Sequence, residues 1–236
     1  MPGTIVFDLS PPEWTAVALS LRIAVVATAW ALPFGVAVGW LLARRQFWGK
    51  TLLDGLVHLP LVLPPVVTGY LLLVSFGRKG PAGGFLYDHL GIVFSFRWTG
   101  AALACGIMGF PLMVRPIRLA LEAVDRRLED AAATLGANTL LAFATVTLPL
   151  ALPGIIAGIL LCFARALGEF GATITFVSNI PGETQTISAL IYTLTQVPGG
   201  DAAAGRLVLV AIVLSMAALI ASELLARRAA TRFHGN

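Results

Sequence analysis

Five long apolar segments constrain this 236-residue chain more than any other feature of its sequence. A helix needs about 20 mostly apolar residues to cross the hydrocarbon core of a membrane. The segments that qualify are 14–43, 55–77, 98–114, 146–163 and 207–222. Only 12% of the residues are charged, where a soluble domain carries about 25%, so most of the chain must face lipid or itself. The sequence therefore predicts an all-α integral membrane protein with about five transmembrane helices.

The basic residues predict how these helices are oriented. Ten Lys or Arg follow the first, third and fifth segments: Arg44, Arg45, Lys50, Arg115, Arg118, Arg126, Arg127, Arg227, Arg228 and Arg232. Four lie in the loops on the opposite side: Arg78, Lys79, Arg97 and Arg206. Because cytoplasmic loops carry the excess of basic residues, we expect a multi-pass inner-membrane protein with a periplasmic N-terminus and a cytoplasmic C-terminus. No basic region precedes the first segment, so we expect it to be a retained span and not a signal peptide.

The sequence contains no complete motif of a nucleotide-binding enzyme or of a metal site. Gly49-Lys50-Thr51 looks like the end of a phosphate-binding loop, but Arg44 occupies the position where that motif needs its first glycine. The histidines and cysteines are isolated and fit no metal-binding spacing: His58, His89, His234, Cys105 and Cys162. The charges flank apolar segments and form no basic patch of the kind that binds nucleic acid. We therefore predict no catalytic residues, no metal, no cofactor and no nucleic-acid partner.

Two stretches do not fit five simple spans. No charge occurs between Asp130 and Arg165, which is too long a stretch for one upright helix. We expect residues 130–143, which are rich in alanine, to form a helix along the cytoplasmic face. Pro149 would then begin a new helix where the chain enters the membrane. Residues 170–177 are apolar and either prolong the fourth span or re-enter the membrane, where protein or a water-filled cavity must cover them.

The stretch 130–149 resembles the cytoplasmic coupling loop of the permease subunits of ABC importers. That loop reads Glu-Ala-Ala, three residues, Gly, and then a spacer that ends in Leu-Pro. The matching residues are Ala131, Ala132, Gly136, Leu148 and Pro149, and Asp130 replaces the usual Glu. The resemblance implies a type-1 transmembrane fold in which this helix docks on a separate ATPase subunit, present in two copies. Small residues let such a helix seat closely, and glycine permits a bend that other residues resist.

A second stretch narrows the subgroup. Residues 165–173 resemble the permeases for oxyanions, and 59–70, 179–186 and 196–200 look most like the molybdate permeases among them. The resemblance covers a permease domain at 14–227, with a short periplasmic segment at 1–13 and a cytoplasmic tail at 228–236. It implies a homodimer in membrane lipid that passes molybdate from a periplasmic binding protein to the cytoplasm by alternating access. Five spans also leave a lone subunit little material with which to enclose a path.

Polar residues near the end of the fourth span are candidates for the translocation pathway. Arg165 and Glu169 lie four residues apart, on one helix face, and ionisable groups at membrane depth are functional candidates. They form either an ion pair that orders the helix or part of a gate. Hydroxyl and amide donors that suit a dianion follow at Thr173, Thr175, Ser178 and Asn179. The external loops 77–97 and 180–205 either dock the binding protein or simply connect the spans.

Two other functions remain open at this point. Sulfate or thiosulfate is a dianion of similar shape to molybdate, and only the family resemblance separates these cargoes. A transporter that works without ATP is the second alternative. The coupling-loop motif and the scarcity of acidic residues at membrane depth, which such a transporter would need to relay protons, argue against it.

Overall fold

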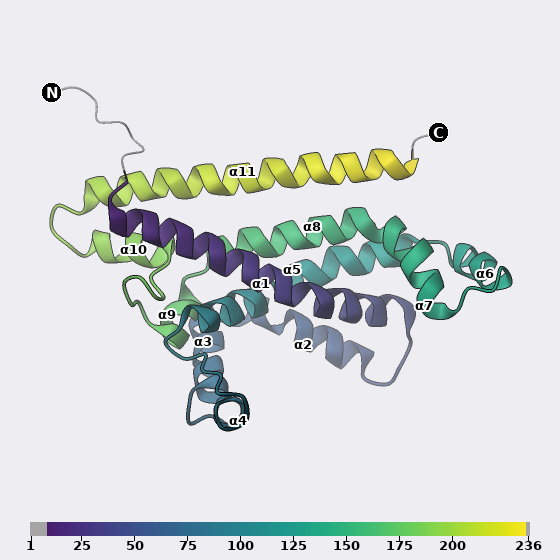
Figure 1. Ribbon diagram of the computed structural model, residues 1–236, viewed down its shortest axis with the longest axis horizontal. Coiled ribbons are helices and arrows are strands. Elements are labelled where there is room, and N and C mark those ends of the chain that lie inside the picture. The colour runs from purple at the N-terminus through teal and green to yellow at the C-terminus, as the bar shows by residue number, and fades with distance from the viewer. Residues whose placement is uncertain (1–8, 235–236) are drawn as a thin grey trace.

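Four long helices form the body of the protein, as the computed structural model of residues 9–234 shows. They are α1 (Pro11–Arg44), α5 (Trp98–Ala123), α8 (Leu148–Leu167) and α11 (Asp201–His234). They lie side by side along the long axis, with α5 packed on both α1 and α8, and α8 on α11 (Figure 1). No strand occurs within the described residues. The predicted all-α membrane fold is confirmed: among the described residues four helices are long and apolar enough to span, and a bent pair makes five if it is counted as one span.

The second predicted span is not a single upright helix. Residues 55–77 are divided between α2 (Lys50–Val62) and α3 (Pro65–Phe76), whose axes differ by 114°. Two consecutive prolines cause the break, because each disfavours the helical conformation of the residue before it. Leu63 and Pro64 accordingly take extended backbone, with ψ of 142° and 134°. The expectation of one continuous second helix was therefore wrong.

The chain before the fourth span also divides differently from the prediction. Residues 130–143 do not form one surface helix, because α6 (Arg126–Thr134) ends in a turn at Gly136. The next helix begins with α7 (Thr139–Ala142), widens into the π-helical segment η1 (Phe143–Thr147) and continues directly into α8. Pro149 lies in the first turn of α8, as predicted, but helical backbone already precedes it in η1. The wider π turn makes room for it, because a proline cannot donate a hydrogen bond to the preceding turn.

The segment after the fourth span is a separate short helix. α8 ends at Leu167, and α9 (Gly171–Val177) begins after a three-residue break, so residues 170–177 do not prolong α8. α9 packs against α3 and α5, and Ala172, Phe176 and Val177 are fully buried. Protein therefore covers this irregular backbone, as its position requires. The remaining helices are α4 (Pro81–Leu90) and α10 (Ile187–Thr195).

Small residues let the long helices approach closely. A Cβ atom at Gly35 of α1 would lie 2.7 Å from the Sδ of Met113 in α5, and one at Gly158 of α8 would lie 2.7 Å from the Met113 carbonyl oxygen. Close backbone approach of this kind is how helices associate in a membrane, where apolar burial alone gives no driving force.

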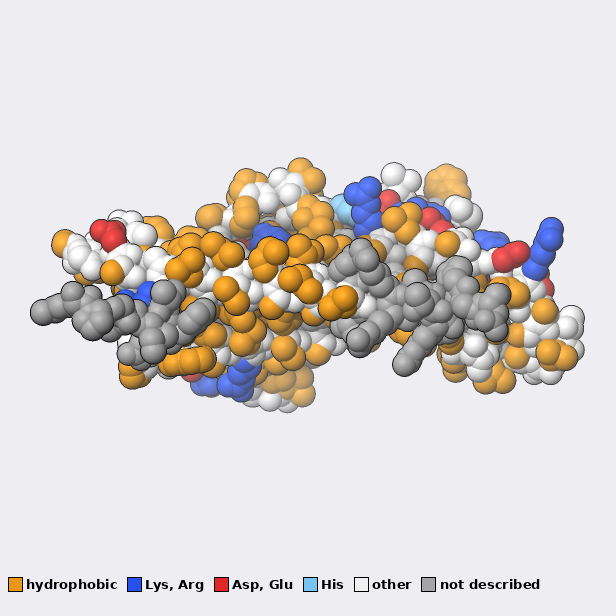
Figure 2. Space-filling model, turned by 90° about the horizontal axis from the view of Figure 1, so that it is seen from above, with side chains coloured by type: hydrophobic (Ala, Val, Ile, Leu, Met, Phe, Trp, Pro, Cys, Tyr) orange, Lys and Arg blue, Asp and Glu red, His pale blue; other side chains and the backbone are white. Residues whose placement is uncertain are grey.

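The face of the molecule that Figure 2 shows is mostly apolar in its middle. Charged side chains on this face gather mainly toward one end (Figure 2).

An ion pair ties the start of α1 to α11. The carboxylate of Glu13 accepts hydrogen bonds from the backbone N–H and the hydroxyl of Ser10, at 2.6 and 2.7 Å. Its other oxygen lies 3.1 Å from the guanidinium of Arg206. The first span therefore begins at Pro11, three residues before the predicted start. Of the predicted terminal segments, residues 1–8 and 235–236 lie outside the described part of the chain.

Candidate functional site

The alanine-rich start of the stretch that matches the coupling-loop pattern lies in α6, an exposed helix at one end of the molecule (Figure 1). The side chain of Asp125 caps α6 by accepting a hydrogen bond from the backbone N–H of Arg127, at 2.9 Å. No residue of this fully described helix is buried. Asp130 and Ala131 face solvent and Ala132 is half-buried. The structure therefore places these three predicted residues together on an accessible surface.

Large apolar side chains surround this surface. The exposed fractions are 47% for Leu128, 89% for Leu135, 76% for Leu140 and 50% for Leu141. These leucines lie in α6, in the turn after it and in α7, at the end of the molecule where charged residues gather (Figures 1 and 2). Grouped exposed apolar side chains that are rimmed by polar residues mark interaction surfaces. The geometry of this end is therefore suited to a protein partner.

Gly136 forms the turn that separates α6 from α7. Its φ is +90°, a conformation that costs residues with a Cβ atom about 1–2 kcal/mol. The N–H of Gly136 donates to the carbonyl of Ala133, and the N–H of Ala137 donates to that of Ala132, each at 3.0 Å. This pair of bonds is the Schellman arrangement that satisfies the last carbonyls of a helix. The glycine at this position thus has a conformational reason to be there.

Leu148 and Pro149, the last residues of the pattern, lie apart from the exposed surface. Both are half-buried in the first turn of α8, where Leu148 packs on a core cluster that includes Ile117 and Ile155. They belong to the helix behind the loop and do not contribute to its exposed face.

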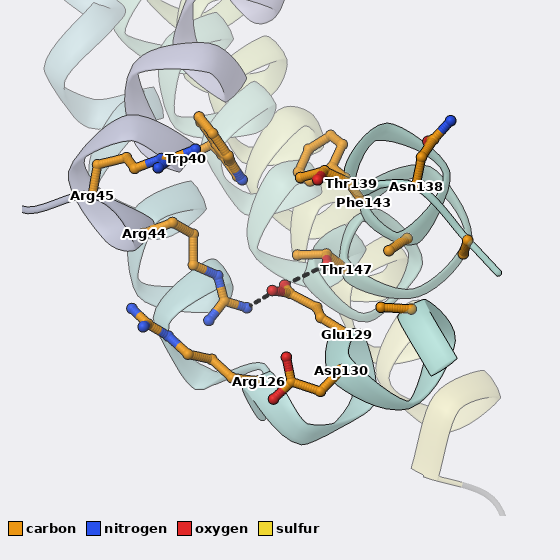
Figure 3. A pocket seen from close by; sticks show the side chains of 13 residues that line it. Trp40, Arg44, Arg45, Arg126, Glu129, Asp130, Asn138, Thr139, Phe143 and Thr147 are labelled. Atoms are coloured by element: carbon orange, nitrogen blue, oxygen red, sulfur yellow. Dashed lines mark hydrogen bonds and ion pairs between the residues drawn. The ribbon is translucent and has the colours of Figure 1, made fainter. Parts of the chain in front are cut away.

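A polar cleft of about 620 Å³ lies between α6, α7 and the end of α1 (Figure 3). Arg44 and Thr147 point toward Glu129 from opposite sides of it. One carboxylate oxygen of Glu129 accepts from the Arg44 guanidinium at 2.8 Å and from the Thr147 hydroxyl at 2.6 Å. The cleft thus contains a bonded three-residue cluster that links α1, α6 and η1. Sequence analysis missed this cluster, because residues 85 positions apart carry no periodic signal of their contact.

The predicted pair of Arg165 and Glu169 is present. The guanidinium of Arg165 lies 2.6 Å from one carboxylate oxygen of Glu169, whose side chain is 1% exposed. The other oxygen accepts the backbone N–H of Ala172 at 2.8 Å, in the first turn of α9. Glu169 therefore joins the end of α8 to the start of α9 and orders the break between these two helices.

Three of the four polar residues after this pair donate hydrogen bonds within the protein. The hydroxyl of Thr173 donates to the carbonyl of Phe170, just before α9, and that of Thr175 donates to the carbonyl of Gly171, each at 2.9 Å. The side-chain amide of Asn179 donates to the hydroxyl of Thr193 in α10 at 2.8 Å, while Ser178 is exposed with φ of +66°. The hydroxyls of Thr173 and Thr175 and the amide of Asn179 are therefore engaged within the protein in this conformation, and their place in the pathway stays a prediction.

Comparison with known proteins gives a consistent result. The profile of the family described as "Binding-protein-dependent transport system inner membrane component" matches residues 32–231. The chain is 62% identical to the molybdenum transport system permease protein ModB of Escherichia coli, over 93% of this chain and 96% of that one. It is 38% identical to the sulfate transport system permease protein CysT of Salmonella typhimurium, over 79% and 67% of the two chains. A crystal structure of a bacterial alginate ABC importer has the same fold, with a TM-score of 0.72 at 16% identity over 93% of this chain and 80% of that one.

Proposed function

This chain belongs to the family of inner-membrane components of binding-protein-dependent transport systems, and we propose that it is the permease subunit of an ATP-driven molybdate importer. The observation that carries this proposal is the identity of 62%, over nearly the full length of both chains, to a molybdenum transport permease. Sulfate is the second candidate cargo. The identity to a sulfate permease is lower and covers less of each chain, which favours molybdate.

The exposed end of the molecule supports a separate ATPase as partner. α6 carries no buried residue, and Leu128 within it and Leu135 directly after it are exposed. An ATPase subunit that receives this helix in a groove would cover these leucines, and apolar fit would contribute more than ion pairs to docking. Two ATPase subunits that close on ATP would draw the coupling helices of two copies together and open the path outward. Hydrolysis would return the path to the inward-facing state.

The two ends of the molecule support the proposed orientation. The end of α1 at Arg44, the end of α5 and the helix α6 lie at the same end, and these regions carry most of the Lys and Arg (Figure 1). The positive-inside rule therefore assigns this end to the cytoplasm and the N-terminus to the periplasm. The loop that contains α4 and the segment around α10 then face the periplasm, where a molybdate-binding protein would dock.

A second copy of the chain completes the proposed importer. α3 leaves a row of apolar side chains exposed, including Val66, Tyr70 and Val74. This row lies directly after the break in the second span, where irregular backbone needs cover from protein or a water-filled path. A homodimer with the path between the two copies meets that need.

Uptake of labelled molybdate tests this function. Cells that lack the chain are compared with the same cells carrying the wild-type copy, at nanomolar molybdate and with excess sulfate or tungstate as competitor. We expect uptake to return with the copy, to resist sulfate and to fall with tungstate. Equal competition by sulfate would refute molybdate as the specific cargo. Uptake that does not depend on the chain would refute the proposed function as a whole.

A further inference from the structure

Glu129 bonds the exposed helix α6 to two other elements of the chain, and one of its partners, Arg44, bonds to the end of a third. Its Oε1 atom accepts from Arg44, the last residue of α1, and from Thr147, the last residue of η1 (Figure 3). The same guanidinium nitrogen of Arg44 also donates to the carbonyl of Val124, which caps the end of α5, at 3.2 Å. One carboxylate oxygen therefore lies at the point where α1, α5, α6 and the base of α8 meet.

The partners of Glu129 are buried, although α6 is not. The side chain of Arg44 is 8% exposed and Thr147 is fully buried, whereas the side chain of Glu129 is 29% exposed. Hydrogen bonds to an ionised group are about twice as strong as neutral ones, and burial of the partners shields them from water. Loss of the carboxylate would leave the Arg44 charge in a buried place without its partner.

The rest of α6 packs on α7 and η1 without side-chain hydrogen bonds to them. No residue of α6 is buried, and no other α6 side chain bonds to a described residue outside its own helix and cap. At its two ends α6 continues into short connections at Val124–Asp125 and at the Gly136 turn. Among described side chains, Glu129 is therefore the one that joins α6 by hydrogen bonds to α1 and to η1, which continues into α8.

Thr147 lies where the helix changes from π-helical to α-helical geometry. Thr147 ends the π-helical segment, and the N–H of the next residue, Leu148, donates to the carbonyl of Phe143, five residues earlier. Single π turns inside α-helices occur frequently at functional sites. A displacement of Thr147 therefore acts on a turn that already departs from α-helical geometry, directly before the span α8.

We propose that Glu129 is a positioning residue that transmits movement of α6 to the spans α1 and α8 through Arg44 and Thr147. This inference rests on the proposed function, because it assumes that an ATPase moves α6. Glu129 does not touch the transported anion in this role.

The experiment measures anion transported per ATP hydrolysed, in vesicles that contain the complete complex with its ATPase and binding protein. Glu129→Gln removes the charge, and Thr147→Val removes one hydroxyl from a buried site while its shape is kept. We expect both variants to retain the ATPase subunit but to lower the ratio about tenfold or more, as loss of a charge-assisted hydrogen bond implies. Thr147→Ser, which restores the hydroxyl, should recover most of the ratio. Glu122→Gln is the matched control, because Glu122 forms an exposed ion pair with Arg118 near the same end.

Two results would overturn the inference. A ratio within about twofold of wild type in both variants would show that movement does not pass through this carboxylate. Loss of the ATPase subunit from the complex would make Glu129 a docking residue instead. A wild-type complex that moves no anion would refute the proposed function but not the connection from α6 through Glu129 to Arg44 and Thr147. That connection therefore needs a measurement that does not depend on transport.

Spin labels provide that readout. Labels at Arg127→Cys in α6 and Gln46→Cys after α1 occupy exposed positions, and the native Cys105 and Cys162 are buried. We expect a narrow distance distribution between them in the otherwise unchanged chain and in Glu122→Gln, and a broadened one in Glu129→Gln and Thr147→Val. The same narrow distribution in all variants would refute the tie between α6 and α1.

Discussion

Gly69→Ala tests the packing of the broken span on α9. Gly69 is buried in α3, and a Cβ atom there would lie 2.5 Å from the carbonyl oxygen of Ala172 and 2.9 Å from its Cα. The Cβ of Thr175 would also lie 2.9 Å away. Carbon atoms in contact are ordinarily about 3.5–4.0 Å apart, so α3 and α9 must separate by several tenths of an ångström. The obstructing atoms include backbone, which cannot rotate away.

The expected magnitude follows from two opposing effects. Overpacking of a tight contact costs about 1–3 kcal/mol, and a clash with backbone belongs in the upper part of that range. Alanine gains about 0.5–1 kcal/mol over glycine in a helix, so the net loss is about 1–2 kcal/mol. Gly55→Ala in α2 is the matched control, because nothing lies within 4 Å of its Cβ position. The difference between the two variants therefore isolates the packing cost, about 2–3 kcal/mol.

The assay is unfolding of the purified protein by SDS titration in mixed micelles, followed by circular dichroism. We expect Gly69→Ala to lower the free energy of unfolding and Gly55→Ala to raise it slightly. Equal gains in the two variants would show that α3 and α9 are not in close contact in the folded protein, and would refute the argument from geometry.

Three further predictions concern the turn after α6, the ion pair after α8 and the start of α1. Gly136→Leu should abolish ATP-driven uptake and leave the protein inserted, because leucine at this φ is strained by about 1–2 kcal/mol and reorients α6; normal uptake would contradict the coupling role. Arg165→Ala should destabilise the protein by about 3–5 kcal/mol because it leaves Glu169 charged and buried, and the double variant with Glu169→Gln should be milder in the same SDS titration. A double variant as unstable as Arg165→Ala alone would argue against a structural pair. Ser10→Ala should lower the free energy of unfolding by about 0.5–1.5 kcal/mol in the same SDS titration, since it removes the hydroxyl that donates to Glu13 and keeps the backbone N–H bond to the same oxygen; an unchanged value would show that this hydroxyl bond contributes nothing.

The spans could be predicted because apolar length is a property of the sequence alone. Segments 14–43, 98–114 and 207–222 all lie inside single helices of the structure. The shape of the second span was predicted wrongly, because the apolar content of a segment is the same whether its helix is straight or bent. The two adjacent prolines at Pro64 and Pro65 were the available signal, since each restricts the residue before it.

The candidate site was predicted in part. The glycine at 136 was assigned a bend from its residue type, and its φ of +90° agrees with that assignment. The cluster around Glu129 was missed, because its members lie in three elements that are distant in sequence. Ser10 and Glu13 carried a readable signal, a serine followed three residues later by a glutamate ahead of an apolar run. The role of the four predicted donors in the pathway stays a prediction, and three of them already bond to nearby backbone or to a neighbouring helix, as short polar side chains often do.

The packing of α3 on α9 has a consequence for the biosynthesis of the chain. The two helices begin at Pro65 and Gly171, so about a hundred residues must be added after α3 before its partner exists. At about 5–20 residues per second, this interval lasts roughly 5–20 seconds. During that time the break at Leu63 and Pro64 has no α9 beside it, and its free backbone groups must stay hydrated or covered by the insertion machinery. The second span is therefore inserted early but reaches its final geometry only after the fourth has been made.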